Sequence, residues 1–267
     1  MAYSLNFLGY LACDYGDYDE GLAKHKQSLK IRQELADKLG IRDSLDNVGH
    51  TYLQTGDFVR ARRYLEESLA LQRDLGGSAG RGWAFIDGIE WTLSDLGELS
   101  AAEGNQSDAR LLLEQSLVRS NEACRMITLI RLGNVAAREL DFAQSDELHR
   151  EALTLARKTS DLVRLVECLE GLATTARLKG RWRRSATLFG AATAVRESIH
   201  SPLPLYQARD HDNDVSTLRG HLGDSAFESA FSEGQALDRD EAVEYALRAA
   251  ELRTNPTGER VGIDKEG

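Results

Sequence analysis

The sequence predicts an all-α protein built as a solenoid of about five helix-turn-helix repeats with a C-terminal helical cap. Three observations lead to this prediction. The 267-residue chain is rich in the helix formers Ala, Leu, Glu and Arg and has only 3 prolines, so long helices are allowed. A pair of an aliphatic and a small residue recurs five times. A turn signal then follows each pair at the same distance, which is typical of a repeat protein.

The repeat frame covers residues 1–201. The aliphatic and small residues pair at Leu8-Gly9, Val48-Gly49, Leu96-Gly97, Leu132-Gly133 and Leu172-Ala173, with spacings of 40, 48, 36 and 40 residues. Seven residues after each small residue comes a turn position, occupied by Gly16, Gly56, Gly104, Leu140 and Gly180. The longest spacing is explained by a glycine-rich connector at 76–82, which we expect to be flexible.

Each unit reads as two helices joined at that turn. A leucine stands four residues before each small residue, at Leu5, Leu45, Leu93, Leu129 and Leu169. Small residues also stand five residues after each turn, at Gly21, Ala61, Ala109, Ser145 and Ser185. These spacings of three and four place the apolar and small side chains on one face of a helix. One hairpin cannot bury such a face alone, so the units are predicted to stack.

The frame ends at Pro202 and Pro204, which break the preceding helix. Residues 202–253 still read as helical and are predicted to cap the last apolar face of the array. Two capping boxes are expected to open helices there, Ser225 with Glu228 and Asp238 with Glu241. Residues 254–267 are polar and are expected to form a disordered tail.

This frame resembles the tetratricopeptide repeat. The matching features are the leucine, the Leu-Gly pair, the turn glycine, the small residue after it, and a later position that holds His25, Leu65, Leu113, His149 and Phe189. The units depart from the family in their length, near 40 rather than 34 residues, and in lacking a proline near their ends. The resemblance implies a right-handed superhelix whose first helices line a concave groove for a protein or peptide segment.

Carried over position by position, the resemblance predicts which side chains line this groove. The candidates are Tyr3, Asn6, Tyr10, Asp43, Asp46, His50, Trp91, Glu98, Asn134, Glu167 and Glu170. They are aromatic, amide and mostly acidic groups. Such groups suit a peptide or basic segment held by hydrogen bonds and one or two aromatic anchors.

A second resemblance concerns the stretch from Gly180 to Ala192, the Pro-Leu-Pro after it, and the helices that follow. These residues are similar to the C-terminal end of large bacterial regulators of the signal-transducing ATPase type, LuxR-family activators among them. The resemblance implies a regulatory, sensor or partner-binding array. The three cysteines lie far apart, without disulfide or metal-ligand spacing, and this indicates a reducing cytoplasm. No G-x-x-x-x-G-K-[ST] phosphate loop is present in the sequence, so ATP hydrolysis is not carried over.

Other chemistry finds little support in the sequence. A net charge of −10 disfavours direct binding to nucleic acid, and no apolar run is long enough to span a membrane. Asp210, Asp212 and Asp214 match the start of a calcium loop, but Val215 and His221 stand where that loop needs Gly and Glu. No catalytic motif or metal-ligand spacing is present, so we expect no enzyme activity, cofactor or metal.

Arg177, Lys179, Arg181, Arg183 and Arg184 surround Trp182 in a basic turn. Residues 203–253 carry eleven Asp and Glu against five Lys and Arg. One hypothesis is therefore that this turn contacts the acidic C-terminal segment within the molecule.

Two functions other than protein binding stay open. A deep pocket with converging polar groups would favour sensing of a small effector. A flat apolar patch at one end of the array would favour self-assembly, or docking on a separate ATPase.

Overall fold

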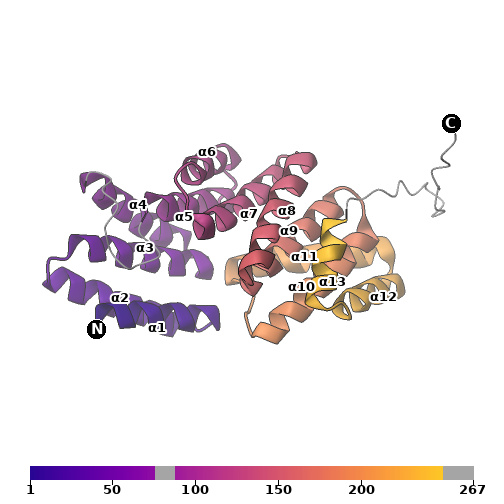
Figure 1. Ribbon diagram of the computed structural model, residues 1–267, viewed down its shortest axis with the longest axis horizontal. Coiled ribbons are helices and arrows are strands. Elements are labelled where there is room, and N and C mark those ends of the chain that lie inside the picture. The colour runs from indigo at the N-terminus through magenta and orange to yellow at the C-terminus, as the bar shows by residue number, and fades with distance from the viewer. Residues whose placement is uncertain (76–87, 249–267) are drawn as a thin grey trace.

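The described residues, 1–75 and 88–248, form thirteen α-helices and no strand in the computed structural model (Figure 1). The repeat helices are α1 (Ala2–Asp14), α2 (Tyr18–Glu34), α3 (Lys38–Thr55), α4 (Phe58–Asp74), α5 (Ile89–Ala102), α6 (Gln106–Leu117), α7 (Glu122–Arg138), α8 (Phe142–Thr159), α9 (Leu162–Leu178) and α10 (Trp182–Ile199). They are followed by α11 (Leu205–Leu222), α12 (Asp224–Gln235) and α13 (Arg239–Leu247). The predicted connector at 76–82 and the predicted tail at 254–267 lie outside the described residues.

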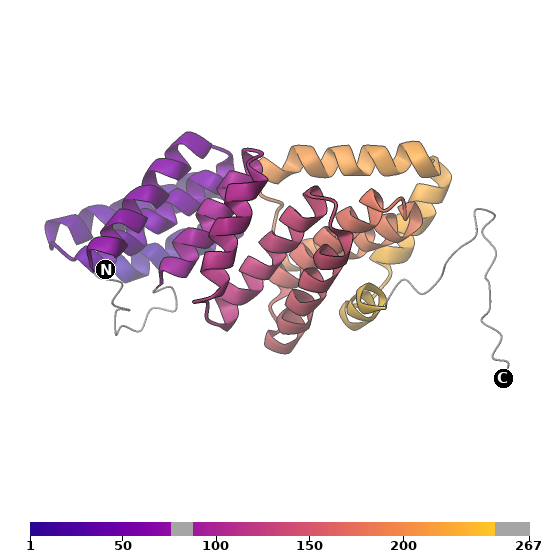
Figure 2. The same ribbon diagram turned by 90° about the horizontal axis from the view of Figure 1, so that it is seen from above.

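The predicted all-α solenoid is confirmed. Helices α1 to α10 pair as five hairpins, and the second helix of each of the first four hairpins packs against the first helix of the next. The units follow one another along an elongated, curved array (Figure 2). Leucines from successive units, such as Leu53, Leu99 and Leu169, are completely buried between them. Among the described residues, the hydrophobic core consists of three clusters along the array, each shared by neighbouring units.

The turn inside each hairpin has the same conformation. All five predicted turn positions adopt a left-handed backbone, with φ of 81° at Gly16, 81° at Gly56, 87° at Gly104, 63° at Leu140 and 70° at Gly180. An Asp or Asn follows in the first four turns, and its side chain accepts a hydrogen bond from a backbone N–H of the second helix. Each of those turns thus ends one helix and caps the next.

The small residue of each first helix lets the second helix approach closely. A Cβ atom on Gly9 would lie 2.6 Å from the ring of His25, and one on Gly133 would lie 2.5 Å from the ring of His149. Both rings are buried, His25 at 1% and His149 at 0% exposed. The two histidines therefore act as packing residues at the later position of the repeat frame.

The three helices that follow the array pack in two different places: α12 and α13 at its C-terminal end, and α11 along its length. α12 crosses α10 so closely that a Cβ on Gly234 would lie 1.9 Å from the carbonyl oxygen of Thr187, and α13 packs against α8, α9 and α10. α12 thus covers the outer side of the last hairpin. α11 instead runs back over the array and contacts α3, α9 and α10, and it is the long orange helix along the upper edge of Figure 2.

One predicted capping box is confirmed and the other is wrong. Asp238 and Glu241 form the reciprocal hydrogen bonds of a capping box at the start of α13. α12 begins one residue before Ser225, after Gly223, and no side chain caps it. Ser225 is therefore already inside the helix and cannot serve as its N-cap.

Candidate binding face

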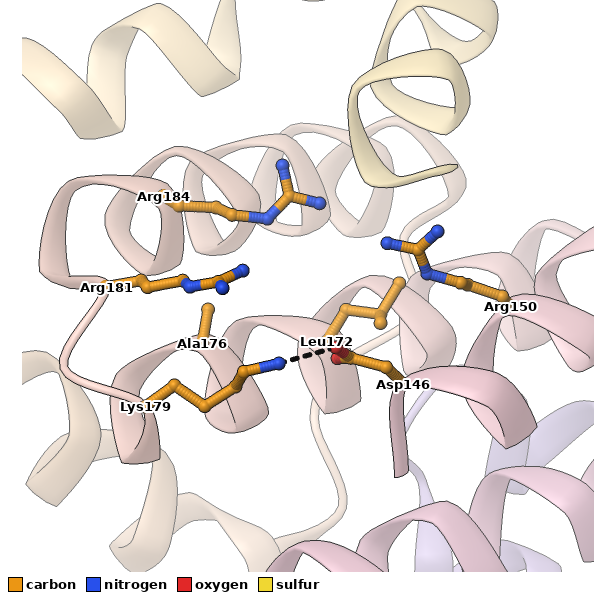
Figure 3. Close-up of a pocket in the computed structure, with 7 residues that line it drawn as sticks. All are labelled: Asp146, Arg150, Leu172, Ala176, Lys179, Arg181 and Arg184. Carbon is orange, nitrogen blue, oxygen red and sulfur yellow. Dashed lines mark hydrogen bonds and ion pairs between the residues drawn. The ribbon is translucent and has the colours of Figure 1, made fainter. Parts of the chain in front are cut away.

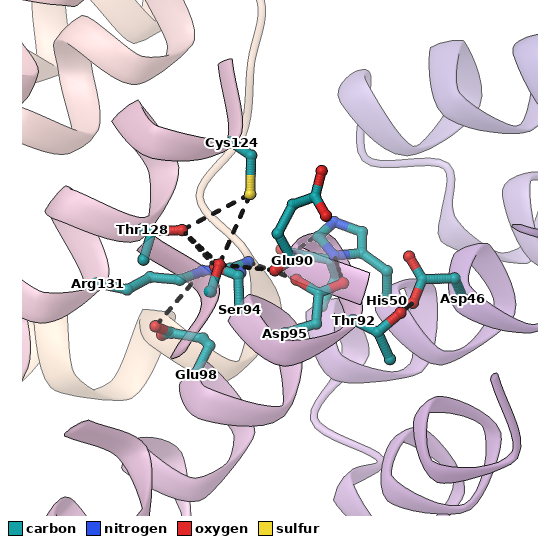
Figure 4. Close-up of polar contacts among 12 residues, drawn as sticks. Asp46, His50, Glu90, Thr92, Ser94, Asp95, Glu98, Cys124, Thr128 and Arg131 are labelled. Atoms are coloured by element: carbon teal, nitrogen blue, oxygen red, sulfur yellow. Dashed lines mark hydrogen bonds and ion pairs between the residues drawn. The ribbon is translucent and has the colours of Figure 1, made fainter. Parts of the chain in front are cut away.

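Polar side chains of α3, α5 and α7 lie close together between the units, and all of them except His50 are buried; we call this group the concave network (Figure 4). Its members are Asp46 and His50 from α3, Thr92, Ser94, Asp95 and Glu98 from α5, and Thr128 and Arg131 from α7. Three predicted groove residues, Asp46, His50 and Glu98, thus lie together. The structure adds Asp95 and Arg131, which the repeat frame did not single out.

Asp95 is the centre of this network. His50 Nδ1 lies 2.9 Å from one of its carboxylate oxygens, and Arg131 Nη2 lies 2.7 Å from the other. Arg131 also donates to Ser94 Oγ at 2.7 Å, and its Nε lies 3.8 Å from Glu98. One buried guanidinium therefore ties three side chains of α5 to α7.

The buried charges of the network shift one another's ionisation. Burial alone would raise the pKa of Asp95, but His50 and Arg131 hold it well below its ordinary value. Asp46 accepts a hydrogen bond from Thr92 at 2.7 Å but has no cation of its own in this network. Burial, with repulsion from Asp95, raises the pKa of Asp46 to about 7. Two neighbouring carboxyl groups of the network are thus shifted in opposite directions, with the pKa of Asp95 lowered and that of Asp46 raised.

α11 closes one side of this face. Its Tyr206 hydroxyl donates to Glu98 at 2.8 Å, and its ring meets Phe58 edge-on with ring centroids 6.3 Å apart. Asp210 lies 3.9 Å from Arg138 at the end of α7. Asp214 then pairs with Arg177 of α9 at 2.8 Å.

The contacts of α11 follow one helix stripe. Tyr206, Asp210, Asp214 and the fully buried Leu218 are each four residues apart, so they lie on one side of the helix. Thr174 of α9 also donates to Asp214 at 3.0 Å. The chain's own helix is therefore bound along the ends of the first helices.

The remaining predicted groove residues are dispersed. Asn6 and Asn134 turn toward the buried histidines of their own hairpins, at 3.4 Å from His25 and 3.1 Å from His149. Tyr10 donates to Asn47 of the next unit. These three side chains contribute to packing inside and between units.

At the two ends of the array the predicted residues lie in ion pairs or on the surface. Glu167 pairs with Arg164 at 2.6 Å, and Glu170 forms a two-pronged pair with Arg196 at 2.6 and 2.7 Å. Asp43 pairs with Arg42, and Arg32 lies over the ring of Tyr3 at 4.7 Å.

The predicted residue Trp91 is half-buried on α5, and its indole N–H has no hydrogen-bond partner among residues 1–75 and 88–248. The arginines that pair with Glu167 and Glu170 were missed because they stand outside the repeat positions. The spacing of three residues between Arg164 and Glu167 in α9 was an available signal for the first pair, whereas Arg196 lies in α10 and had no such local signal.

The hypothesis that the basic turn contacts the acidic C-terminal segment is confirmed. Arg177 pairs with Asp214, and Arg183 pairs with Glu233 at 2.7 Å. Trp182 stacks on His221 with ring centroids 3.8 Å apart. The turn is therefore engaged within the molecule.

A small cavity lies beside this turn, lined by Asp146, Arg150, Leu172, Ala176, Lys179, Arg181 and Arg184 (Figure 3). Its volume of about 10 Å³ holds one water molecule at most. Lys179 pairs with Asp146 at 2.7 Å. Arg184 donates to the carbonyl oxygens of Tyr245 and Ala246 at the end of α13. Arg184 thus stabilises the packing of α13 against α10.

Within 1–75 and 88–248, no group of three or more His, Cys, Asp or Glu side chains is arranged to hold a metal ion. The acidic run 210–214 is part of the continuous helix α11 rather than a loop. None of the helices in this described part is long and apolar enough to cross a membrane.

Comparison with known proteins supports the repeat assignment and shows similarity to proteins named as putative transcriptional regulators. The sequence profile of the tetratricopeptide repeat family matches residues 1–74. The chain is also similar to "Putative HTH-type transcriptional regulator Mb0914c" of Mycobacterium bovis and to "Putative HTH-type transcriptional regulator Rv0890c" of Mycobacterium tuberculosis. Each is 29% identical over 162 residues, which are 60% of this chain and 18% of the relative. The similarity thus covers less than a fifth of those proteins' length.

Proposed function

We propose that this chain is the protein-binding part of a bacterial regulatory protein and that its concave face binds a helical segment of a partner. Tetratricopeptide repeats are protein-binding modules, and the match to residues 1–74 supports this class. The observation that carries the finer proposal is α11. It is an amphipathic helix whose stripe of Tyr206, Asp210 and Asp214 is bound by side chains of α5, α7 and α9.

The side chains of α11 indicate which side chains a partner helix would need in order to bind at the same place. An aromatic hydroxyl meets Glu98, and two carboxylates at intervals of four meet Arg138 and Arg177. A partner helix with a Tyr followed by acidic residues at positions four and eight would make the same contacts. Because α11 is covalently attached, it competes at high effective concentration. The partner must therefore bind an open form from which α11 has moved away.

The relatives' names support a regulatory setting. They describe HTH-type transcriptional regulators, and most of their length lies outside the region similar to this chain. We assign the chain to regulators of the signal-transducing ATPase type, acting in the cytoplasm without catalytic activity of its own. A reading frame for a nucleotide-binding ATPase joined to this one would support the assignment.

The binding proposal is tested with a fluorescein-labelled peptide of residues 203–222, which contains α11. We expect weak binding to the wild-type chain, because its own α11 occupies the face. The double variant Tyr206→Ala, Asp214→Ala loosens α11 and should bind the labelled peptide at least tenfold more tightly in fluorescence anisotropy.

The matched control changes the opposite side of α11. Asp212 and Ser216 are exposed, so Asp212→Ala, Ser216→Ala should bind the peptide as weakly as the wild type. Adding Arg177→Ala to the loosened chain should reduce binding again, because it removes the partner of Asp214. Equal peptide binding by the loosened and the control variants would refute the proposal.

A further inference from the structure

The basic side chains around the small cavity of Figure 3 converge from different helices, and we call them the cationic cluster. Its members are Arg150 of α8, Lys179 directly after α9, Arg181 directly before α10, and Arg184 of α10. Figure 3 shows their charged ends directed toward one another across the cavity. Four positive charges therefore surround one point of a chain whose net charge is −10.

The cluster carries a surplus of positive charge. Among the described residues that line the cavity, Asp146 alone is acidic, and it pairs with Lys179 at 2.7 Å. Glu244 of the adjacent helix α13 pairs instead with Arg157, which lies outside the cluster. The three arginines of the cluster thus have no carboxylate partner among the lining residues.

Two of these arginines donate to uncharged groups. Arg150 donates to the carbonyl oxygen of Leu247 at 2.9 Å. Arg184 donates to that of Ala246 at 3.0 Å. Carbonyl groups at a helix C-terminus carry only a partial negative charge. Burial, with repulsion from Arg150 and Arg181, lowers the pKa of Arg184. The end of α13 therefore satisfies hydrogen bonds of the cluster without neutralising its charge.

Two donors of the cluster are still available to a ligand. Arg181 stands where the first four hairpins have a capping Asp or Asn, and its side chain does not cap α10. It is exposed and extends over the cavity in Figure 3 without contact to another lining residue. Nε of Arg150 is buried and has no hydrogen-bond partner within residues 1–75 and 88–248. A group that enters from the side of Arg181 would meet both donors.

We propose that the cationic cluster binds a phosphate group, either as the free ion or on a small phosphate monoester. The cavity of about 10 Å³ has room for one oxygen atom, so one phosphate oxygen occupies it while the others stay at the rim beside Arg181. A phosphate group carries up to about two negative charges near neutral pH, which matches the surplus of the cluster. The planar guanidinium groups of arginine can donate paired hydrogen bonds to its oxygens.

This site is separate from the face that α11 occupies. It uses none of the residues of the concave network, so it does not depend on the binding of a partner helix there. Inorganic phosphate is a very small ligand, and its outer oxygens stay in contact with water. We therefore expect a dissociation constant of roughly 0.1–10 mM for one phosphate per chain.

Equilibrium dialysis of the full chain against radiolabelled inorganic phosphate, at constant ionic strength, measures this binding. Arg181→Gln should weaken it at least fivefold, because it removes an arginine of the rim and leaves the contacts to α13 in place. Arg183→Gln is the matched control. It removes the same charge from the same turn, but Arg183 pairs with Glu233 and does not line the cavity. Its affinity should stay within twofold of the wild type.

A third variant predicts tighter binding, which a poorly folded chain would not produce. Asp146→Asn removes the carboxylate of the cavity and releases Lys179, so phosphate should bind at least threefold more tightly. Circular dichroism and the melting temperature check that all three variants keep the wild-type fold.

Three results would overturn the proposal. They are no binding by the wild type at about 10 mM phosphate, equal losses in Arg181→Gln and Arg183→Gln, and no gain in Asp146→Asn. Competition with glycerol 3-phosphate distinguishes the two sources of the phosphate group. Displacement of the labelled ion would assign the site to phosphate monoesters, and a lack of displacement would assign it to the free ion.

Discussion

Two histidines are buried where the repeat otherwise holds leucine or phenylalanine. Their place could be predicted from the sequence, because His25 and His149 fall at the later position of the repeat frame. The structure places each ring against the small residue of the first helix, Gly9 and Gly133. Burial lowers the pKa of His25 and of His149 to about 4. Both side chains are therefore neutral in the folded protein above that pH.

This burial makes folding sensitive to acid. Below about pH 6.5 the unfolded chain binds a proton at each histidine that the folded chain does not bind. The two histidines therefore leave the free energy of unfolding unchanged above about pH 6.5 and lower it as the pH drops toward 4. His149→Phe, which matches Phe189 in the last unit, should reduce the loss of unfolding free energy between pH 7 and 4.5 by about 2 kcal/mol. Urea denaturation at both pH values measures this change.

The control for this prediction is an exposed histidine. His200 has a left-handed backbone at the end of α10, a conformation that Asn also tolerates. His200→Asn should therefore keep the fold and serves as the matched variant in which an exposed histidine is removed. An unchanged pH dependence in His149→Phe would show that the buried ring is not the source of the acid sensitivity.

The candidate groove was predicted only in part, and the reason is visible in individual residues. Asp46, His50 and Glu98 were identified because repeat register places them on the inner side of their helices. Asp95 corresponds to the packing position of Asn47 and became part of the network through His50 and Arg131, which lie 2.9 and 2.7 Å away on the neighbouring units. Repeat register determines the side of the helix, but it does not determine which charges pair across units.

At the scale of one helix pair, the turn between the helices is the most uniform feature of the array. Four of the five turns have glycine at the left-handed position, and the fourth turn has Leu140 with φ of 63°. A left-handed backbone costs a residue with a side chain about 1–2 kcal/mol. The 65% exposed side chain of Leu140 recovers little of that cost by packing.

Leu140→Gly should therefore raise the free energy of unfolding by about 0.5–1 kcal/mol, since glycine's greater freedom in the unfolded chain offsets part of the gain. Leu111→Gly is the matched control. Leu111 is 55% exposed but lies within α6, where glycine should lower stability by about 1 kcal/mol. Thermal or urea unfolding of the two variants distinguishes them, and destabilisation by both would argue against strain at Leu140.

Helix boundaries in the array were largely predictable because they depend on local residues, the turn glycine and the capping Asp or Asn. The position of α11 was not. Its partners are far away in sequence, with Tyr206 and Glu98 separated by 108 residues. The apolar and acidic pattern of 202–253 predicted helices but contained no local signal for where they pack.

Across the whole molecule, α11 changes how the repeats depend on one another. In a simple linear array each unit contacts only its neighbours, so the two ends unfold independently. Here α11 joins α3 and α5 to α9 and α10, and Pro202 packs beside Gly16 of the first hairpin. The first and last units are thus linked by the segment that contains α11, in addition to the contacts between neighbouring units.

Loosening this link should lower the cooperativity of unfolding. In Tyr206→Phe, Asp214→Asn we expect backbone amides of α1 to α4 to exchange with deuterium at least several-fold faster while those of α9 and α10 change little. Hydrogen exchange measured helix by helix tests this expectation, with Asp212→Asn, Ser216→Ala as the control. Equal acceleration in all units would mean that α11 does not couple the two ends.

The path of α11 also has a mechanical consequence. A curved stack of hairpins behaves as a soft spring, since small rotations at each junction add up along its length. α11 spans several of those junctions on one side, with Tyr206 and Asp214 fastened to different units. α11 therefore resists uncoiling of the array. The array cannot uncoil until the contact of Tyr206 with Glu98 or that of Asp214 with Arg177 breaks. When the two ends of the array are pulled apart, we therefore expect high resistance at first, followed by an abrupt extension when one of these contacts breaks.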